Sequence, residues 1–315
     1  MALPVQKIAI VGVTGTIGTY LTQALLSKNR FSITAITRTD SKAEIPSAVE
    51  VARVDYNDHS SLTEALKGHD ALIITTSVFA PKDTSAKLIK AAAAAAVPWI
   101  LPNEFGMSST DETARDTIGM SKKGDRELIE SLGVSSWIGI TCGFWYEHSL
   151  SNGQLYGFDF DKRSVAFFDD GTQKLNTSTW EQVGRATAAV LSLPADKLST
   201  YRNRMVYVSS FAVSQKEMFE SLKRVTGTSD NEWHVTFEPA KQRYRDACES
   251  LEKGERIAFG RKLYTRYFYE DAGLFEKSHG LDNENLGLPE ESLDVATAHA
   301  VKLAKDGYWA KYGQH

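Results

Sequence analysis

Three glycines near the N-terminus form a pattern that can bind phosphate. The uncharged, β-branched run Ile8–Val11 is typical of a strand buried on both faces of a parallel sheet. The spacing Gly-x-x-Gly-x-x-Gly follows at once, and a helical pattern then continues to about Lys28. Glycines allow a sharp turn and let backbone N–H groups approach a pyrophosphate, which the positive end of the helix dipole attracts. The candidate ligands in this turn are Gly12, Thr14, Gly15, Thr16, Ile17 and Gly18.

The position of this turn, directly between a strand and a helix, predicts a dinucleotide site; a glycine turn without a ligand is the alternative. A basic residue after the second predicted strand, Ser32–Thr37, indicates which dinucleotide is bound. Sites that prefer NAD usually carry Asp or Glu there, whereas Arg38, with Lys42 nearby, suits the 2′-phosphate of NADP. Asp40 can compete for the guanidinium, and a solvated loop charge is the other interpretation. We therefore expect NADPH to bind in preference to NADH.

Residues that directly follow the other strands are further candidates, because ligands of a parallel sheet bind at the carboxyl ends of its strands. The predicted strands are Ile8–Val11, Ser32–Thr37, Val49–Val54, Asp70–Thr75, Trp99–Leu101, Ser136–Thr141 and Arg204–Val208. Asp55 follows the third and can lie beside the adenine, Thr76 and Ser77 follow the fourth, and Asn103 follows the fifth. We expect these four residues at the cofactor-binding edge of the sheet.

A lysine on a later helix is the main candidate for acid–base chemistry. The Tyr-x-x-x-Lys pair that most short-chain dehydrogenases use is absent, because none of the twelve tyrosines is followed by Lys four residues later. Lys122 lies at the start of the predicted helix Ser121–Leu132. A lysine beside an apolar substrate loses water, which favours its neutral form and allows general acid or base catalysis. A solvated lysine on a charged helix face is the alternative.

Four elements together resemble the isoflavone reductase-like and NmrA-like group of atypical short-chain dehydrogenases. They are the glycine turn at 12–18, Asn-Glu-Phe-Gly at 103–106, Lys-x-x-x-Arg-x-x-Ile-Glu at 122–130 and Gly-Phe at 143–144. Plant members include pinoresinol–lariciresinol, isoflavone and phenylcoumaran benzylic ether reductases. The resemblance covers about the first 150 residues well, and the remainder matches in general layout. Each motif is weak singly and specific as part of the set.

The resemblance implies NADPH as cofactor and hydride transfer to a small aromatic or conjugated molecule. It also implies a catalytic lysine seven residues before the Ile of the Ile-Glu pair, which is Lys122 when counted from Ile129. An error of one residue would select Lys123 instead. Phe144 is implied as a residue that packs on the nicotinamide ring. Lys122 is therefore expected both to contact the cofactor and to manage the proton.

One departure from the plant pattern follows the sixth strand. Plant reductases commonly have Asn-x-Phe there, whereas this chain has Cys142 two residues before Phe144. The change puts a plant-type substrate geometry in doubt. The bulky residues that follow include Tyr146 and His148, each of which can relay a proton or simply pack where two lobes meet. The sequence favours packing for both.

Composition excludes several classes of protein. The net charge of −4 and the pI of about 6.0 provide no basic excess for nucleic acid or an anionic membrane. The apolar run Ala91–Leu101 is interrupted by Pro98 and is too short to span a membrane. Two distant cysteines and the absence of a signal-peptide pattern favour a cytoplasmic protein. The seven histidines show neither HxxxH nor HExxH spacing, so we expect no metal site.

The alternation of strands and helices predicts an α/β fold, a Rossmann-type doubly wound parallel sheet with a smaller, discontinuous α+β substrate lobe. We assign residues 1–150 to the dinucleotide-binding domain, with 176–210 returning to it. Residues 151–175 and 225–290, both rich in aromatic side chains, form the predicted substrate lobe, and 291–315 a C-terminal helix.

Two functions remain open at this level. The first is an NADPH-dependent reductase of a small aromatic or conjugated, secondary-metabolite-like substrate. The second is an NmrA-like NADP-binding redox sensor that regulates a partner without catalysis. The aromatic lobe and Lys122 favour the enzyme. The sequence does not identify the substrate or the stereochemistry of hydride transfer, and it fits either a monomer or a homodimer.

Overall fold

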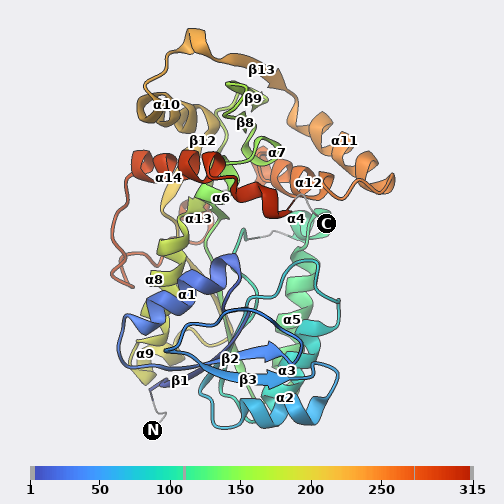
Figure 1. Cartoon of the computed structure of the whole chain (residues 1–315), viewed down its shortest axis with the longest axis vertical. Coiled ribbons are helices and arrows are strands. Elements are labelled where there is room, and N and C mark those ends of the chain that lie inside the picture. The colour runs from blue at the N-terminus through green and yellow to red at the C-terminus, as the bar shows by residue number, and fades with distance from the viewer. Residues whose placement is uncertain (1–3, 109–110, 273, 313–315) are drawn as a thin grey trace.

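A parallel sheet of seven strands forms the lower half of the molecule (Figure 1). The structure, a computed structural model, describes residues 4–108, 111–272 and 274–312. The strands in spatial order are β11 (Arg204–Tyr207), β6 (Ser136–Thr141), β5 (Trp99–Leu101), β4 (Ala71–Ile74), β1 (Lys7–Val11), β2 (Ser32–Arg38) and β3 (Glu50–Val54). Every pair is parallel, and each of the seven predicted strands is present within two residues of its predicted limits.

The order of the strands creates a crevice between β1 and β4. The chain builds outward from β1 through β2 to β3, and then crosses to β4 and continues in the other direction. In open α/β sheets, ligands bind outside the carboxyl ends of the strands at this point of reversal. The first glycine turn follows β1, so the fold places it at the crevice.

Helices cover both faces of the sheet, as the doubly wound fold requires. Helices α1 (Thr16–Leu26) and α8 (Trp180–Leu191) pack against each other on one face. Helices α2 (His59–Leu66), α3 (Thr84–Ala94) and α5 (Gly119–Leu132) cover the other face (Figure 1). The alanines of α3 keep this helix narrow, and Ala91 and Ala92 are fully buried. Two apolar cores, one on each side of the sheet, therefore stabilise the Rossmann-like fold.

A second, smaller lobe forms the upper half of the molecule (Figure 1). It contains two three-stranded sheets, whose strands are β12 (Phe211–Ser214), β10 (Lys174–Ser178) and β7 (Phe144–Trp145) in one, and β13 (His234–Glu238), β9 (Ser164–Phe168) and β8 (Phe158–Asp159) in the other. Its longer helices are α10 (Gln215–Thr226), α11 (Ala240–Glu252), α12 (Ala258–Arg266) and α14 (Leu293–Lys305). The shorter ones are α4 (Asp111–Asp116), α6 (Tyr146–Leu150), α7 (Gly153–Tyr156) and α13 (Phe275–Ser278).

An aromatic core holds this lobe together. It is rich in phenylalanine and tyrosine, and it draws on α6, α10 and α14 as well as on the segments predicted for the substrate lobe. The helix α9 (Ala195–Ser199) lies between α8 and β11, next to the Rossmann sheet. Three short 3-10 helices complete the described chain, at Asp230–Glu232, Glu270–Ala272 and Tyr308–Tyr312. The predicted C-terminal helix is seen as α14 and the last of these, while residues 313–315 lie outside the described residues.

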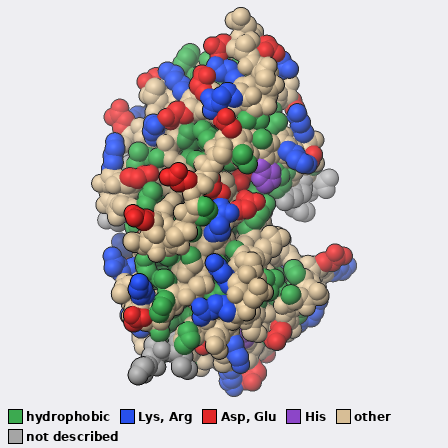
Figure 2. Space-filling view, turned by 90° about the vertical axis from the view of Figure 1, so that its left-hand side faces the viewer, with side chains coloured by type: hydrophobic (Ala, Val, Ile, Leu, Met, Phe, Trp, Pro, Cys, Tyr) green, Lys and Arg blue, Asp and Glu red, His purple; other side chains and the backbone are tan. Residues whose placement is uncertain are grey.

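The outer surface carries charges of both signs. Figure 2 shows Lys and Arg side chains interspersed with Asp and Glu over one face, and an indented outline between the two lobes. Among the described residues, no helix combines the length and apolar character needed to cross a bilayer.

Candidate active site at the carboxyl edge of the sheet

The glycine turn after β1 is too tightly packed for a side chain at Gly12 or Gly18. Gly12 has a φ of +88°, and a Cβ atom on it would lie 2.6 Å from the backbone oxygen of Thr75. A Cβ atom on Gly18 would lie 1.9 Å from the backbone oxygen of Gly12. The Thr75 hydroxyl donates a hydrogen bond of 2.7 Å to the backbone oxygen of Val11, which joins the ends of β1 and β4. The turn is thus built by close backbone packing, as a phosphate-binding turn requires.

The start of α1 is open to an anionic ligand. Its N-cap residue is Gly15, which makes no side-chain capping bond, and Thr14 and Gly15 are both exposed. Ile17 is buried in the core between α1 and the sheet, so only its backbone can face a ligand. Because the first turn of a helix presents N–H groups along its axis, this geometry fits a pyrophosphate.

The basic residues at the end of β2 and in the loop after it lie at the far side of the same edge. Arg38 is 66% exposed, and its Nε atom lies 3.2 Å from a carboxylate oxygen of Asp40. Lys42 is exposed in the following loop. Arg38 pairs in register with Val54 of β3, so Asp55, whose carboxylate accepts the Asn57 N–H at 2.8 Å, follows on the neighbouring strand. These residues can hold the adenosine end of a dinucleotide that lies across the edge.

The loops after β4 and β5 are tied to each other. The side-chain amide of Asn103 donates a hydrogen bond of 2.7 Å to the backbone oxygen of Thr76. Ser77 is exposed, and its hydroxyl accepts the Phe79 N–H at 3.2 Å. Asn103 therefore fixes the shape of the crevice through its amide, and Thr76 and Ser77 border it.

Lys122 lies in the first turn of α5 and reaches the loop that follows β5. Its ammonium donates a hydrogen bond of 3.2 Å to the backbone oxygen of Glu104 and lies 3.8 Å from the Glu104 carboxylate. The Lys122 side chain is 18% exposed, and its Nζ atom lies beside Gly106, where an added Cβ atom would meet it at an ordinary contact distance of 3.6 Å. Arg126, one turn further along α5, also pairs with the Glu104 carboxylate and lies over the Trp137 ring. Among the residues that the structure describes, Glu104 thus holds the lysine ammonium at the sheet edge.

Phe144 belongs to the junction between the sheet and the upper lobe. Its ring is 7% exposed and stacks on Tyr264 with a centroid distance of 3.8 Å. The Tyr264 hydroxyl shares a hydrogen bond of 2.9 Å with Ser149. Burial raises the pKa of the nearby Cys142 thiol to about 12, so this thiol is not a nucleophile at neutral pH.

A family model matches most of the chain. The NmrA-like family model covers residues 4–286. This chain belongs to the NmrA-like family. A curated relative, oxidoreductase aprR of Aspergillus flavus, is 30% identical over 310 residues, which are 94% of this chain and 99% of the relative. Isoflavone reductase of Cicer arietinum is 28% identical over 214 residues, which are 60% of this chain and 67% of that protein.

Solved structures share the fold of this NmrA-like chain. A structure described as AtPrR2 with NADP⁺ and (+)pinoresinol has a TM-score of 0.73 at 18% identity, covering 95% of this chain and 99% of the other. The NADPH complex of the quinone oxidoreductase QOR2 from Escherichia coli has a TM-score of 0.70 at 20% identity, covering 93% and 99%. At these identities, the likeness shows the fold alone.

Tyr146 and His148 have packing contacts in this NmrA-like chain. Tyr146 is fully buried, its hydroxyl shares a hydrogen bond of 2.7 Å with Thr297, and burial raises its pKa well above the usual value. His148 lies 3.0 Å from the Tyr308 hydroxyl and contacts the Trp309 ring. These contacts agree with the packing interpretation that the sequence favoured.

Sequence reasoning missed Glu104 as a member of the site. Its side chain is 3% exposed, and it contacts both cations of the Lys-x-x-x-Arg pattern. That pattern was itself the available signal, because residues four apart lie on the same face of a helix and a buried carboxylate near them needs a counter-ion. Tyr264, which covers one face of Phe144, had no comparable signal.

The structure thus brings most of the predicted residues to one edge. The glycine turn, Thr76, Asn103 and Lys122 surround the crevice, while Arg38, Lys42 and Asp55 lie where the outer strands end. Two cavities elsewhere, of about 370 and 220 Å³, are in the upper lobe and are lined by none of these residues. The roles of the individual residues stay predictions.

Proposed function

We propose that this protein is an NADPH-dependent reductase that transfers a hydride to a small aromatic or conjugated substrate. The observation that carries the proposal is the position of Lys122 in the first turn of α5, where its ammonium bonds to the loop after β5 at the carboxyl edge of the sheet. A cationic side chain there can exchange a proton with a substrate, while the helix N-terminus accepts phosphate.

The turn at residues 12–18 fits the phosphates of NADPH, because α1 begins at an exposed Gly15 with no side-chain cap, and a Cβ atom at Gly12 or Gly18 would collide with backbone and displace the turn. Backbone groups of Thr16 and Ile17 would bind the pyrophosphate, since the Gly15 N–H already donates to the Gly12 carbonyl within the turn. Arg38 with Lys42 would bind the 2′-phosphate. NADPH supplies a hydride when bound. Structural relatives described as complexes with NADP(H) support this choice of cofactor.

Lys122 supplies the proton chemistry in this proposal. The Glu104 carbonyl accepts one hydrogen bond from the ammonium and fixes its position, while the other N–H groups can reach a substrate oxygen. Arg126 pairs with the same carboxylate, so Glu104 does not need to take the lysine proton to neutralise its own charge. The lysine can then give its proton to an anion that develops on the substrate and recover it from solvent.

The upper lobe supports an aromatic substrate. Phe79, in the loop after β4, is 71% exposed and meets the ring of Phe259 on α12 edge to face, with centroids 5.7 Å apart. This contact joins the loop next to the crevice to the upper lobe and presents apolar surface to a flat ring. Relatives named isoflavone reductase, and a structure containing pinoresinol, support the same class of substrate.

The direct test is NADPH oxidation, measured at the nicotinamide absorbance band, with a panel of isoflavones, lignans, quinones and triphenylmethane dyes. We expect turnover with at least one class and a preference for NADPH over NADH. Calorimetry with NADPH and NADP⁺ tests cofactor binding separately. Absence of binding to both would contradict the proposal at its first step.

One observation favours the second candidate, a sensor that binds NADP(H) without catalysis. Tyr264 covers one face of the Phe144 ring, so packing of the nicotinamide against that face requires Tyr264 to move. A sensor must distinguish the two redox states, whereas an enzyme need not. A large difference in affinity between NADPH and NADP⁺, together with no turnover across the panel, would favour the sensor.

A further inference from the structure

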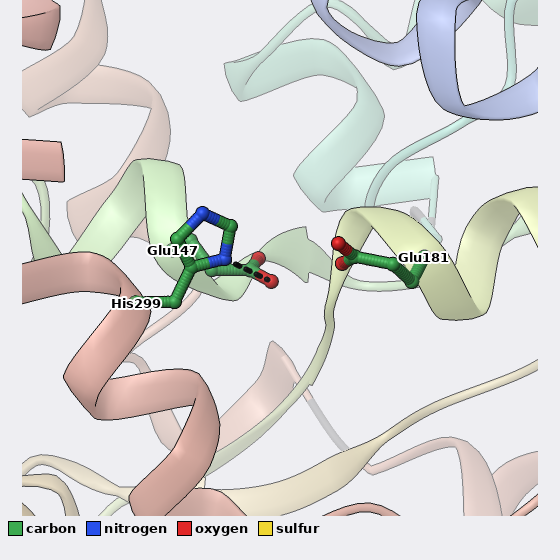
Figure 3. A group of neighbouring side chains, drawn as sticks. All are labelled: Glu147, Glu181 and His299. Carbon is green, nitrogen blue, oxygen red and sulfur yellow. Dashed lines mark ion pairs between the residues drawn. The ribbon is translucent and has the colours of Figure 1, made fainter. Parts of the chain in front are cut away.

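Three potential metal ligands meet where the two lobes join, away from the sheet edge. Glu147 lies on α6, Glu181 is the second residue of α8, and His299 lies on α14. Each offers one ligand atom, and these atoms lie within 4.8 Å of one another. Figure 3 shows the Glu147 carboxylate between the His299 ring and the carboxylate of Glu181. Three separate elements therefore contribute to one cluster.

The buried carboxylate of Glu147 lacks sufficient partners. Its side chain is 1% exposed, and its Oε1 atom lies 3.8 Å from Nδ1 of His299. Among the residues that the structure describes, its Oε2 atom accepts no hydrogen bond. A buried carboxylate costs free energy unless its charge is paired and its oxygens are satisfied. The imidazole of His299, which is charged only when protonated and which also faces Glu181, leaves this requirement incompletely met.

We propose that Glu147, Glu181 and His299 bind a divalent transition-metal ion, with Zn²⁺ as the best match. Two carboxylates and one neutral imidazole carry two negative charges, which a divalent cation neutralises. Zinc binds carboxylate oxygen and imidazole nitrogen at about 2.0–2.2 Å, which separates tetrahedral ligand atoms by about 3.4 Å. Glu181 is exposed, so its side chain can rotate inward to close the remaining gap. Water completes the coordination.

The site would hold the two lobes together. Trp180, next to Glu181, stacks on Tyr20 of α1 in the Rossmann core, and its ring also meets His299 edge to face. Glu147 and His299 lie on helices that pack against each other in the upper lobe. A metal ion shared by these helices fixes α8 to α6 and α14, and it does so without contact to the glycine turn or Lys122. The proposal therefore does not depend on the proposed function.

The sequence-based expectation of no metal site rested on local spacing. These ligands come from three distant segments, so no HxxxH or HExxH pattern marks them. The choice of zinc over magnesium follows from the imidazole, because Mg²⁺ prefers oxygen ligands and water. A parallel titration with MgCl₂ therefore tests whether the site prefers zinc.

The test is calorimetric titration of ZnCl₂ into the full-length chain after treatment with EDTA and dialysis. We expect one zinc ion per chain at micromolar concentration or below, a rise in melting temperature with zinc, and much weaker binding of MgCl₂. Glu181→Gln and His299→Gln should each lower the zinc affinity about tenfold or more. The matched control is His234→Gln, since His234 is an exposed histidine on β13 outside the cluster.

Circular dichroism of each variant checks that the fold is retained, and Glu181→Gln alters only a surface side chain. Two results would overturn the proposal. One is failure of the unmodified chain to bind zinc at micromolar concentration. The other is equal zinc affinity in the unmodified chain, Glu181→Gln and His299→Gln, which would place the ion at another site.

Discussion

The Lys122 ammonium donates its hydrogen bond to the backbone of Glu104, and the Glu104 carboxylate is used mainly by Arg126. One residue of the loop after β5 thus holds the catalytic candidate through its carbonyl and a neighbouring cation through its side chain. The Glu104 carbonyl therefore positions Lys122, while the Glu104 carboxylate and Arg126 neutralise each other's charge. A change in the carboxylate and a change in the lysine should therefore have different consequences.

Lys122→Met should lower turnover far more than it lowers the affinity for NADPH, because the lysine is expected to supply the proton and the phosphates are held elsewhere. Loss of a positioned general acid commonly lowers the rate about 100- to 10,000-fold. Steady-state kinetics with the best substrate of the panel measures kcat, and calorimetry measures cofactor affinity. Lys123→Met is the neighbouring comparison on the same helix. If Lys123→Met lost activity and Lys122→Met kept it, the assignment would be off by one residue.

Glu104→Gln should destabilise the protein by about 3 kcal/mol, because it leaves the partly buried Arg126 without its counter-ion. The exposed pair of Glu64 and Lys67 offers a matched control, and Glu64→Gln should cost less than about 0.5 kcal/mol. Urea unfolding measures both changes. Equal effects of the two substitutions would show that burial of Glu104 contributes nothing to the strength of its ion pair.

Gly18→Ala should be among the most damaging small substitutions in the chain. The added methyl group would overlap the backbone oxygen of Gly12, so we expect a loss of about 3 kcal/mol or more and loss of NADPH binding. Gly124 lies in α5 with open space around its Cβ position. Gly124→Ala should stabilise by about 0.5–1 kcal/mol, since alanine is the better helix former. Thermal and urea unfolding of both variants provide the comparison.

Arg38→Ala should reduce the affinity for NADPH and leave that for NADH unchanged, because the guanidinium is expected to bind only the 2′-phosphate. Asp40 holds this guanidinium in an exposed ion pair. Asp40→Ala should therefore strengthen NADPH binding. Calorimetry with NADPH and with NADH measures how far each substitution changes the affinity for each cofactor. An equal loss of NADPH and NADH affinity in Arg38→Ala would assign the residue a structural role.

The parts of this molecule that sequence could predict are those set by local order. Gly12 to Gly18 lie between one strand and one helix, and the alternation of strands and helices determines which edge their neighbours share. The stacking of Tyr264 on Phe144 needs α12 to return to the junction, and no local pattern encodes that return. The cluster of Glu147, Glu181 and His299 was likewise not predictable from local patterns, because it forms only when three distant helices pack together. Long-range packing of the upper lobe is thus what the sequence pattern left undetermined.

The ion pair between His299 and Glu147 should make stability depend on pH in the absence of metal. Glu147 raises the pKa of His299, and burial raises the pKa of Glu147 itself, while Glu181 and Lys302 also act on the imidazole. In the folded state both groups therefore hold protons to higher pH than in the unfolded state.

The stabilisation from His299 is fully present below its unfolded pKa and is lost as the pH rises through its folded pKa. Glu147 acts in the same direction. Because its pKa is higher in the folded state than in the unfolded state, ionising it at higher pH disfavours the folded state. Urea unfolding in EDTA should thus show a stability advantage of the unmodified chain over His299→Gln near pH 6 that shrinks by pH 8.5. An advantage that grew with pH would reverse the assigned sign and show that the pair is not protonated as described.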